Sequence, residues 1–145
     1  MAVRWRLCIA VFSVAVMTMF AAAQEQKPAV KHAAAPQTSA ASGKEMFMAY
    51  CASCHGTDAK GDGPAATALK DAPADLTALA KTNGGKYPSD KVMSVLRGQA
   101  NLAAHGTQEM PVWGKVFWKM SQGHEGEVQQ RVGNLSHYIE SLQVK

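Results

Sequence analysis

The chain has 145 residues, with 15 Lys and Arg against 11 Asp and Glu and a formal net charge of +4 at neutral pH. The lysines are scattered singly and no series of stacking aromatic residues accompanies them, which excludes the usual composition of a nucleic-acid-binding protein. No strand-type alternation and no internal repeat occurs, so the sequence predicts an all-α fold.

The N-terminal segment has the three parts of an export signal. Arg4 and Arg6 precede an almost unbroken apolar run, and three alanines at the end of that run supply the small residues that signal peptidase reads. We expect residues 1–23 to be a cleaved signal peptide, Cys8 to leave with it, and the mature protein to be periplasmic. The alternative is an uncleaved membrane anchor, although the run is at the short limit of the ~20 apolar residues that span a bilayer.

Residues 24–42 are rich in Ala, Pro, Lys and Gln and contain no aromatic residue. Such a segment offers little apolar surface to bury against the entropy cost of ordering it, and we expect a disordered tether. The folded part would then be a single domain over residues 43–145. A domain of this size buries only an intermediate share of its surface, so a large apolar cofactor would form a main part of its core.

The first predicted helix, about residues 43–55, ends in Cys51-Ala52-Ser53-Cys54-His55. Two cysteines three positions apart, followed directly by histidine, form the C-x-x-C-H signature of c-type haem attachment. On a helix this spacing places the three side chains on one face, so both thiols can add to the porphyrin vinyl groups while the imidazole reaches the iron. The sequence therefore predicts one haem c, bound covalently through two thioethers to Cys51 and Cys54 and ligated by His55.

Other interpretations of the cysteine pair fit less well. A structural zinc site needs four ligands, and the chain has no second pair of cysteines or of Cys and His. A thioredoxin-like redox motif needs a strand before it, whereas residues 43–50 have a helical pattern. A plain disulfide remains an alternative, because the expected compartment is oxidising.

Turn-forming residues and apolar periodicity divide the rest of the chain into short helices and loops. Asp75 is a predicted helix cap, and the pair Pro88 and Gly98 marks the two ends of one helix. The expected elements are a loop over 56–64, helical pieces at 65–70 and 75–80, a helix over 88–98, a loop over 98–111, a helix over 112–120 and a polar loop over 121–126.

The last predicted helix, about residues 127–143, has the clearest periodicity. Apolar residues recur at steps of four and three, so one face must be buried. We expect this face to pack on the first helix through Gly43 and Phe47, where glycine lets the two backbones approach closely. The apolar face consists of Val128, Val132, Leu135, Ile139 and Leu142.

A low-spin electron carrier needs a second axial ligand on the side of the iron opposite His55. We expect Met110, because it lies in a loop, is followed by the φ-restricting Pro111 and comes 55 residues after His55. His105, in the same loop, is the alternative. The ligand pair His/Met would raise the reduction potential. Less suitable candidates are Met46 and Met48 on the helix of His55, Met93 in the expected core, His137 on the expected surface, and Met120 and His124.

The domain resembles a small class I bacterial cytochrome c, similar to the mono-haem domains of terminal oxidases and dehydrogenases. The resemblance rests on Gly43-x-x-x-Phe47-x-x-x-Cys51-x-x-Cys54-His55-Gly56, Gly61-Asp62-Gly63-Pro64-Ala65, Ala74-Asp75-Leu76-Thr77, Met110-Pro111-Val112-Trp113-Gly114 and Leu135-x-x-Tyr138-Ile139-x-x-Leu142. It implies three to five helices around one haem and crossed N- and C-terminal helices. It also implies that the Pro64 carbonyl accepts the other imidazole N–H of His55. Residues 118–126 depart from the pattern and are a candidate partner-binding segment.

These features predict an exported electron carrier that exchanges single electrons with redox protein partners. With both axial positions filled, substrate cannot reach the metal, so we expect no enzymatic activity. One alternative is the electron-entry subunit of a membrane-bound oxidase or dehydrogenase complex. A second is an open-site haem protein that binds a gas or peroxide.

Overall fold

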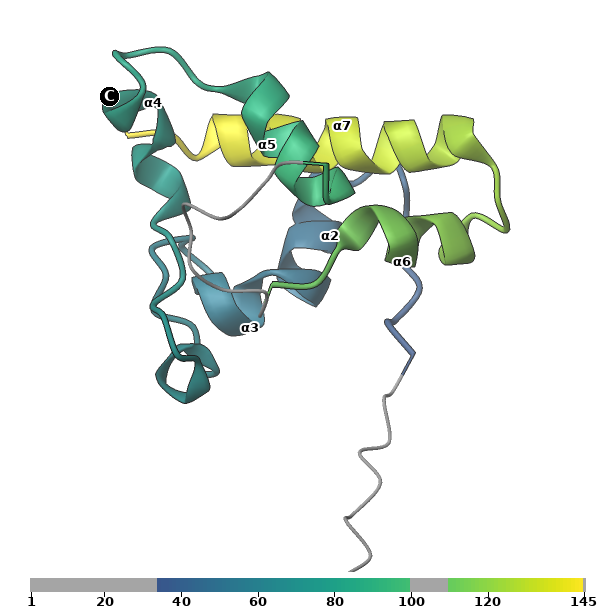
Figure 1. Ribbon diagram of the computed structural model, residues 1–145, viewed down its shortest axis with the longest axis horizontal. Coiled ribbons are helices and arrows are strands. Elements are labelled where there is room, and N and C mark those ends of the chain that lie inside the picture. Colours follow the sequence, from purple (N-terminus) through teal and green to yellow (C-terminus); the bar gives the residue numbers. More distant parts are fainter. Residues whose placement is uncertain (1–33, 100–109, 145) are drawn as a thin grey trace, which may run out of the picture. The chain divides into compact units, whose positions relative to one another are not determined.

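The computed structural model describes residues 34–99 and 110–144, which belong to one compact unit beginning at Ala34. The expected signal peptide with Cys8, residues 24–33 of the expected tether, and His105 lie outside the described residues. Within these ranges every regular element is helical, which confirms the all-α class (Figure 1). The elements are α2 (Gly43–Tyr50), α3 (Ala52–His55), the 3₁₀ turns η1 (Ala66–Ala68) and η2 (Leu76–Ala78), α4 (Leu79–Thr82), α5 (Ser89–Arg97), α6 (Trp113–Met120) and α7 (Glu125–Ser141).

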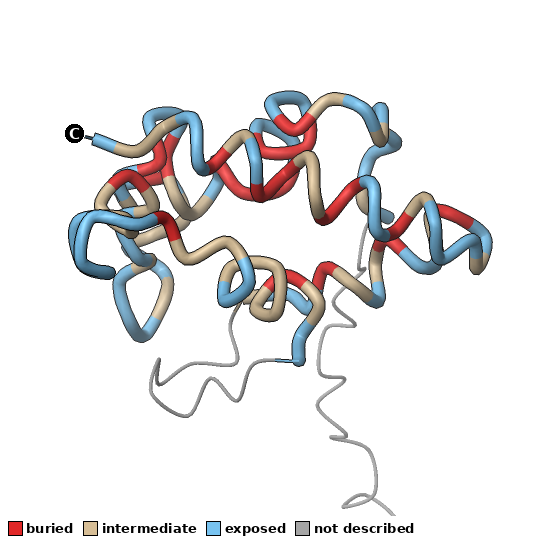
Figure 2. Tube along the Cα trace, turned by 90° about the horizontal axis from the view of Figure 1, so that it is seen from above, coloured by how far each residue is buried: buried red, intermediate tan, exposed pale blue. Residues whose placement is uncertain are grey.

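The longest helix, α7, is the element on which the others pack. Its predicted apolar face is buried except for Leu142, which is half-buried just beyond the helix end. Helices α2, α5 and α6 each contact α7, and Figure 2 shows the buried residues gathering where the helices face one another. No helix in residues 34–99 or 110–144 combines the length and the apolar character that crossing a bilayer requires.

Helices α2 and α7 cross at Gly43, as the sequence predicts. A Cβ atom on Gly43 would collide with the carbonyl oxygen of Asn134 and the Cβ of Tyr138, so only glycine permits this approach. The Phe47 ring lies 5.5 Å, centroid to centroid, from the Tyr138 ring. The expected contact between the first and last helices is therefore confirmed.

Helix α6 packs on the C-terminal end of α2 through aromatic rings. The Tyr50 ring stacks on Trp113 with a centroid distance of 5.2 Å and lies 5.8 Å from Phe117. Trp113 and Phe117 are both buried, and they face the core from successive turns of α6. This cluster places the start of α6 beside the residue that precedes Cys51.

Several predicted helix boundaries are confirmed by their caps. The Asp75 carboxylate accepts a hydrogen bond from the Thr77 N–H at 2.8 Å at the start of η2, and Gly98 ends α5 with a left-handed φ of 72°. The first predicted helix is divided, however. Cys51 has φ −110° and ψ −37°, which ends α2 and begins α3.

Residues 34–42 differ from the disordered tether expected there. The Tyr50 hydroxyl donates to the Pro36 carbonyl at 2.6 Å and lies 2.7 Å from the Thr38 hydroxyl. The Asn134 side-chain amide donates to the Ala40 carbonyl at 2.8 Å. We call residues 34–42 the N-terminal arm. No sequence pattern predicts the arm, because its contacts are single hydrogen bonds to the Pro36 and Ala40 carbonyls and the Thr38 hydroxyl.

Candidate haem site

The three residues of the attachment motif lie in a single turn of the chain. The Cys51 carbonyl accepts hydrogen bonds from the backbone N–H groups of Cys54 at 3.1 Å and His55 at 2.8 Å. Cys51 and Cys54 are both free thiols and are not joined to each other. The structure therefore brings the predicted attachment residues together without a disulfide between them.

The Cys51 thiol has the properties of a buried, protonated group. Its exposed fraction is 6%, and burial, with a smaller contribution from the charge of Cys54, raises its pKa to about 12. A redox-active cysteine needs a depressed pKa, because its thiolate is the reactive form. The raised pKa of Cys51 therefore disfavours the redox-pair interpretation. Within the described ranges, no three His, Cys, Asp or Glu side chains are grouped so that they could hold a metal ion.

The His55 imidazole is held through one of its two ring nitrogens. Nδ1 lies 3.0 Å from the carbonyl oxygen of Ala74. Since a carbonyl can only accept, Nδ1 carries the proton and donates it, which leaves the lone pair on Nε2. Burial lowers the pKa of His55, and the hydrogen bond to Ala74 opposes this only in part. The ring is therefore kept neutral, in the tautomer that ligates metal through Nε2.

The acceptor for His55 is Ala74 and not Pro64, which corrects the expectation drawn from the family resemblance. Residues 61–65 run along the end of α3, where the N–H groups of Gly61, Gly63 and Ala65 donate to the carbonyls of His55, Cys54 and Ser53 at 2.8–3.1 Å. A Cβ on Gly63 would collide with backbone atoms of α3, so glycine is required for this approach. This stretch therefore covers the carbonyl end of α3, whereas a later part of the loop reaches the imidazole.

Two contacts hold the Ala74 carbonyl in place. The Leu76 N–H donates to the Ala59 carbonyl at 2.8 Å, which closes the loop after the motif. The Asp75 carboxylate accepts from both the N–H and the hydroxyl of Thr77, at 2.8 and 2.6 Å, and the hydroxyl bond lowers the pKa of Asp75. Asp75 was expected as a cap. Ala74 was missed because a backbone carbonyl has no sequence signal.

Met110, the expected sixth ligand, lies on a segment separate from the attachment motif. It is half-buried and packs against the hydrophobic core. Three residues later, Trp113 stacks on Tyr50, the neighbour of Cys51. Three residues of extended chain span at most about 11 Å, so this contact keeps Met110 near the motif.

The other candidate ligands occupy positions that suit other roles. Met46 is fully buried and Met48 is exposed on the same helix. Met93 and Met120 pack against the core, and His137 is an exposed side chain 3.5 Å from Glu140. The His124 ring contacts the Ser121 carbonyl at 2.7 Å where α7 begins.

The residues present fit a covalently attached haem. Two free thiols and a neutral imidazole with an available Nε2 share one turn of the chain. Half-buried apolar side chains of η2, α4 and α5 pack against the core in the segment that follows the motif, namely Leu76, Leu79, Val92 and Met93.

Comparison with known proteins agrees with this fit. The family model described as Cytochrome c matches residues 40–143, which is most of the chain. No curated protein and no solved structure matches the sequence. With a family match over the whole helical domain and an attachment motif in one turn, the chain belongs to the cytochrome c family, whose function is haem-based electron transfer.

Proposed function

We propose that this chain is an exported, mono-haem class I cytochrome c that carries single electrons between redox protein partners. Haem c is attached to Cys51 and Cys54, and His55 and Met110 are the axial ligands. The observation that carries the proposal is the 3.0 Å contact between His55 Nδ1 and the Ala74 carbonyl, which leaves Nε2 available beside two free thiols.

The loop around Ala74 supports the role of His55 as a permanent ligand. The hydrogen bond at Nδ1 fixes the orientation of the ring and increases the basicity of Nε2, as partners of metal-bound histidines do. Because the acceptor is a backbone carbonyl held by the Leu76 and Asp75 contacts, the ring does not depend on a mobile side chain.

The segment around Met110 supports its role as the second ligand. Pro111 restricts the backbone next to it, which lowers the entropy cost of presenting a weak thioether ligand. The stacking of Trp113 on Tyr50 ties the same segment to the attachment motif. His105 stays the alternative ligand.

The bound haem supplies reversible one-electron exchange, and the ligand pair His/Met raises its reduction potential. The protein contributes two fixed ligands, so that neither axial position is open to a substrate. We therefore infer an electron carrier and not an enzyme. Residues 1–23 would direct export, and the attachment reaction would take place in the periplasm.

The test compares Met110→Ala with Met93→Ala in the haem-loaded protein. Met93 is the matched control, because it is a half-buried methionine that packs against the core. We expect Met110→Ala to abolish the weak far-red absorption band of the ferric methionine–iron bond and to lower the reduction potential. Met93→Ala should keep the band. Survival of the band in Met110→Ala would show that another residue is the sixth ligand.

A further inference from the structure

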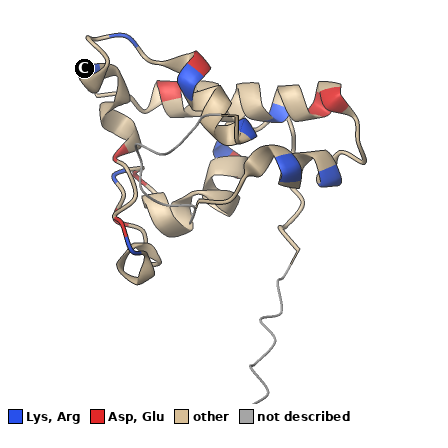
Figure 3. Ribbon diagram, viewed as in Figure 1, with Lys and Arg blue, Asp and Glu red and all other residues tan. Residues whose placement is uncertain are grey.

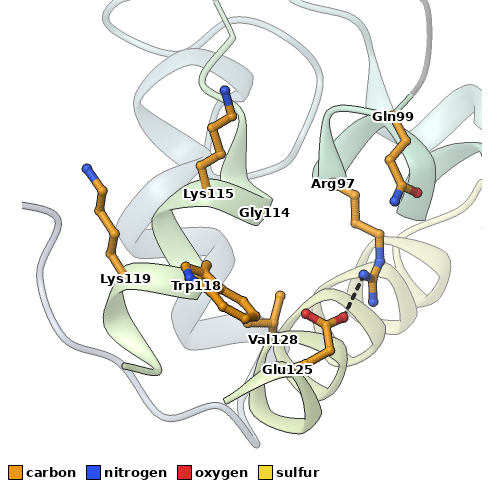
Figure 4. Close-up of a pocket in the computed structure, with 8 residues that line it drawn as sticks. All are labelled: Arg97, Gln99, Gly114, Lys115, Trp118, Lys119, Glu125 and Val128. Carbon is orange, nitrogen blue, oxygen red and sulfur yellow. Dashed lines mark hydrogen bonds and ion pairs between the residues drawn. The ribbon is translucent and has the colours of Figure 1, made fainter. Parts of the chain in front are cut away.

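A shallow groove of about 380 Å³ lies where α5, α6 and α7 meet (Figure 4). Trp118 of α6 and Val128 of α7 line its apolar part. The ion pair between Arg97 and Glu125, with a nitrogen–oxygen distance of 3.1 Å, forms one wall. We call this the α6 groove. It is separate from the attachment motif and has no part in ligating the iron.

Trp118 is a half-exposed side chain that lies against Gly123. Its exposed fraction is 48%, the largest of any aromatic residue in the described ranges. The indole lies over Gly123, where a Cβ would come within 3.4 Å of the ring, and the Gly123 N–H donates to the Trp118 carbonyl at 2.9 Å. Its own indole N–H has no acceptor among residues 34–99 and 110–144. A half-exposed tryptophan with a free donor has the character of an interface anchor.

Two unpaired positive charges stand on the rim of the groove. Lys115 and Lys119 are exposed, lie one helical turn apart and make no ion pair within the described part of the chain. Helix α6 carries no acidic residue (Figure 3). Figure 4 shows both lysine side chains extending away from the groove, whereas the Trp118 ring points toward Val128. The complementary ligand has carboxylates next to an apolar side chain.

An acidic protein segment fits this surface better than a membrane does. A membrane-surface helix needs a broad exposed apolar face, whereas Trp113 and Phe117, the other aromatic residues of α6, are buried in the core. The groove also has a polar wall, the pair of Arg97 and Glu125, which suits a polypeptide and not acyl chains.

The outer face of α6 lies close to the attachment motif, because the buried face of the same helix packs against the residue that precedes the motif. Trp113 and Phe117 pack on Tyr50, the residue before Cys51. A ligand on the outer face of α6 would therefore lie about one helix diameter, ~10 Å, from the attachment motif.

We propose that the α6 groove docks an acidic segment of a redox partner protein, with Trp118 as the apolar anchor and Lys115 and Lys119 pairing with carboxylates. The proposal rests on the electron-carrier function proposed above and names the chemistry of its partner.

The experiment uses the reduced, haem-loaded full chain and a synthetic ten-residue peptide with four glutamates around one leucine. Nuclear magnetic resonance follows the indole N–H signals during the titration. We expect the Trp118 signal to shift, with binding that weakens as salt is raised. Lys115→Gln with Lys119→Gln should weaken binding about tenfold, and Trp118→Ala by tenfold or more.

The matched control is Lys44→Gln with Lys81→Gln, which removes the same net charge from exposed positions outside the groove. This variant should keep the affinity of the wild type. Equal weakening by both double variants, or no binding at low salt, would overturn the proposal. A third outcome would also overturn it: the protein binds vesicles of phosphatidylcholine and phosphatidylglycerol (3:1) through Lys115 and Lys119 but does not bind the peptide.

The haem absorption spectrum of each sample tests the electron-carrier function separately, because a normal spectrum without peptide binding refutes docking alone.

Discussion

Arg131 shows how one residue can connect several elements. Its side chain is 4% exposed, and it donates to Glu127 at 2.8 and 3.0 Å and to the Thr38 hydroxyl at 3.2 Å. The guanidinium carbon also lies 6.0 Å from the centre of the Phe117 ring. A buried charge of this kind is tolerated only while its partner stays ionised, so Glu127 controls the contribution of Arg131 to stability.

We therefore predict that Glu127→Gln lowers the free energy of unfolding at pH 7, because it leaves the buried guanidinium without a counter-charge. Arg131→Met should be tolerated better, since it removes the buried charge itself. The control is Glu140→Gln, whose only ion-pair contact in the described ranges is with the exposed His137 and which should change little. Chemical unfolding of the haem-loaded proteins measures all three. Equal stability of Glu127→Gln and Glu140→Gln would contradict the prediction.

The same pair sets a pH dependence. The hydrogen bond from Arg131 lowers the pKa of Glu127 from its usual 4.5. A carboxyl with a depressed folded pKa contributes its full stabilisation above 4.5 and loses it as the pH falls through the folded value. The difference between wild type and Glu127→Gln should therefore persist at neutral pH and shrink below pH 4.5.

At this scale the sequence predicted the side chains of the site and missed a backbone partner. The residues Cys51, Cys54 and His55 have a fixed spacing, and spacing is visible in a sequence. The acceptor for His55 is set by how the loop between His55 and Ala74 closes. That closure depends on the contact of Leu76 with Ala59 and on the approach of Gly63 to α3. Neither contact has a local pattern.

At the scale of elements, the crossing of α2 and α7 is the contact most sensitive to a single added methyl group. At Gly43 the neighbouring atoms are the backbone of Asn134 and the Cβ of Tyr138, and neither can move without shifting α7. At Gly133, inside α7, a Cβ would meet nothing within 4 Å. Gly43, in α2, therefore has no room for a methyl group, whereas Gly133, in α7, has open space around it.

Gly43→Ala should therefore destabilise the protein by about 1–3 kcal/mol, because the helices must separate to accept the methyl group. Gly133→Ala should instead stabilise it by about 0.5–1 kcal/mol, because alanine reduces the entropy cost of ordering the helix. Thermal and chemical unfolding of the two variants gives both values. A similar change in both would mean that helix propensity alone, and not the crossing, decides the outcome at Gly43.

Most helices were predictable because apolar periodicity and capping residues are local signals. The apolar stripe of α7, the Asp75 cap and the Gly98 end all appear in the structure as expected. The division of the first helix at Cys51 was not predictable, because Cys51 itself has no helix-breaking property.

At the scale of the whole molecule, the described domain begins at the N-terminal arm and not at α2. The arm contacts α2 through Tyr50 and α7 through Arg131 and Asn134. Ser42 then caps α2 by accepting a hydrogen bond from the Glu45 N–H at 3.1 Å. Composition indicated a tether because it measures how much apolar area a segment can bury, whereas this arm is held by hydrogen bonds to side chains far along the chain.

If these hydrogen bonds hold the arm, Tyr50→Phe should release it and leave the haem site intact. The substitution removes the hydroxyl that bonds Pro36 and Thr38 but keeps the ring that stacks on Trp113. We expect the free energy of unfolding to fall by about 1–2 kcal/mol, cleavage of residues 34–42 by proteases to become faster, and the haem spectrum to stay unchanged. The control is Tyr138→Phe, because the Tyr138 hydroxyl has no hydrogen-bond partner among the described residues. Faster cleavage in both variants, or in neither, would show that Tyr50 does not hold the arm.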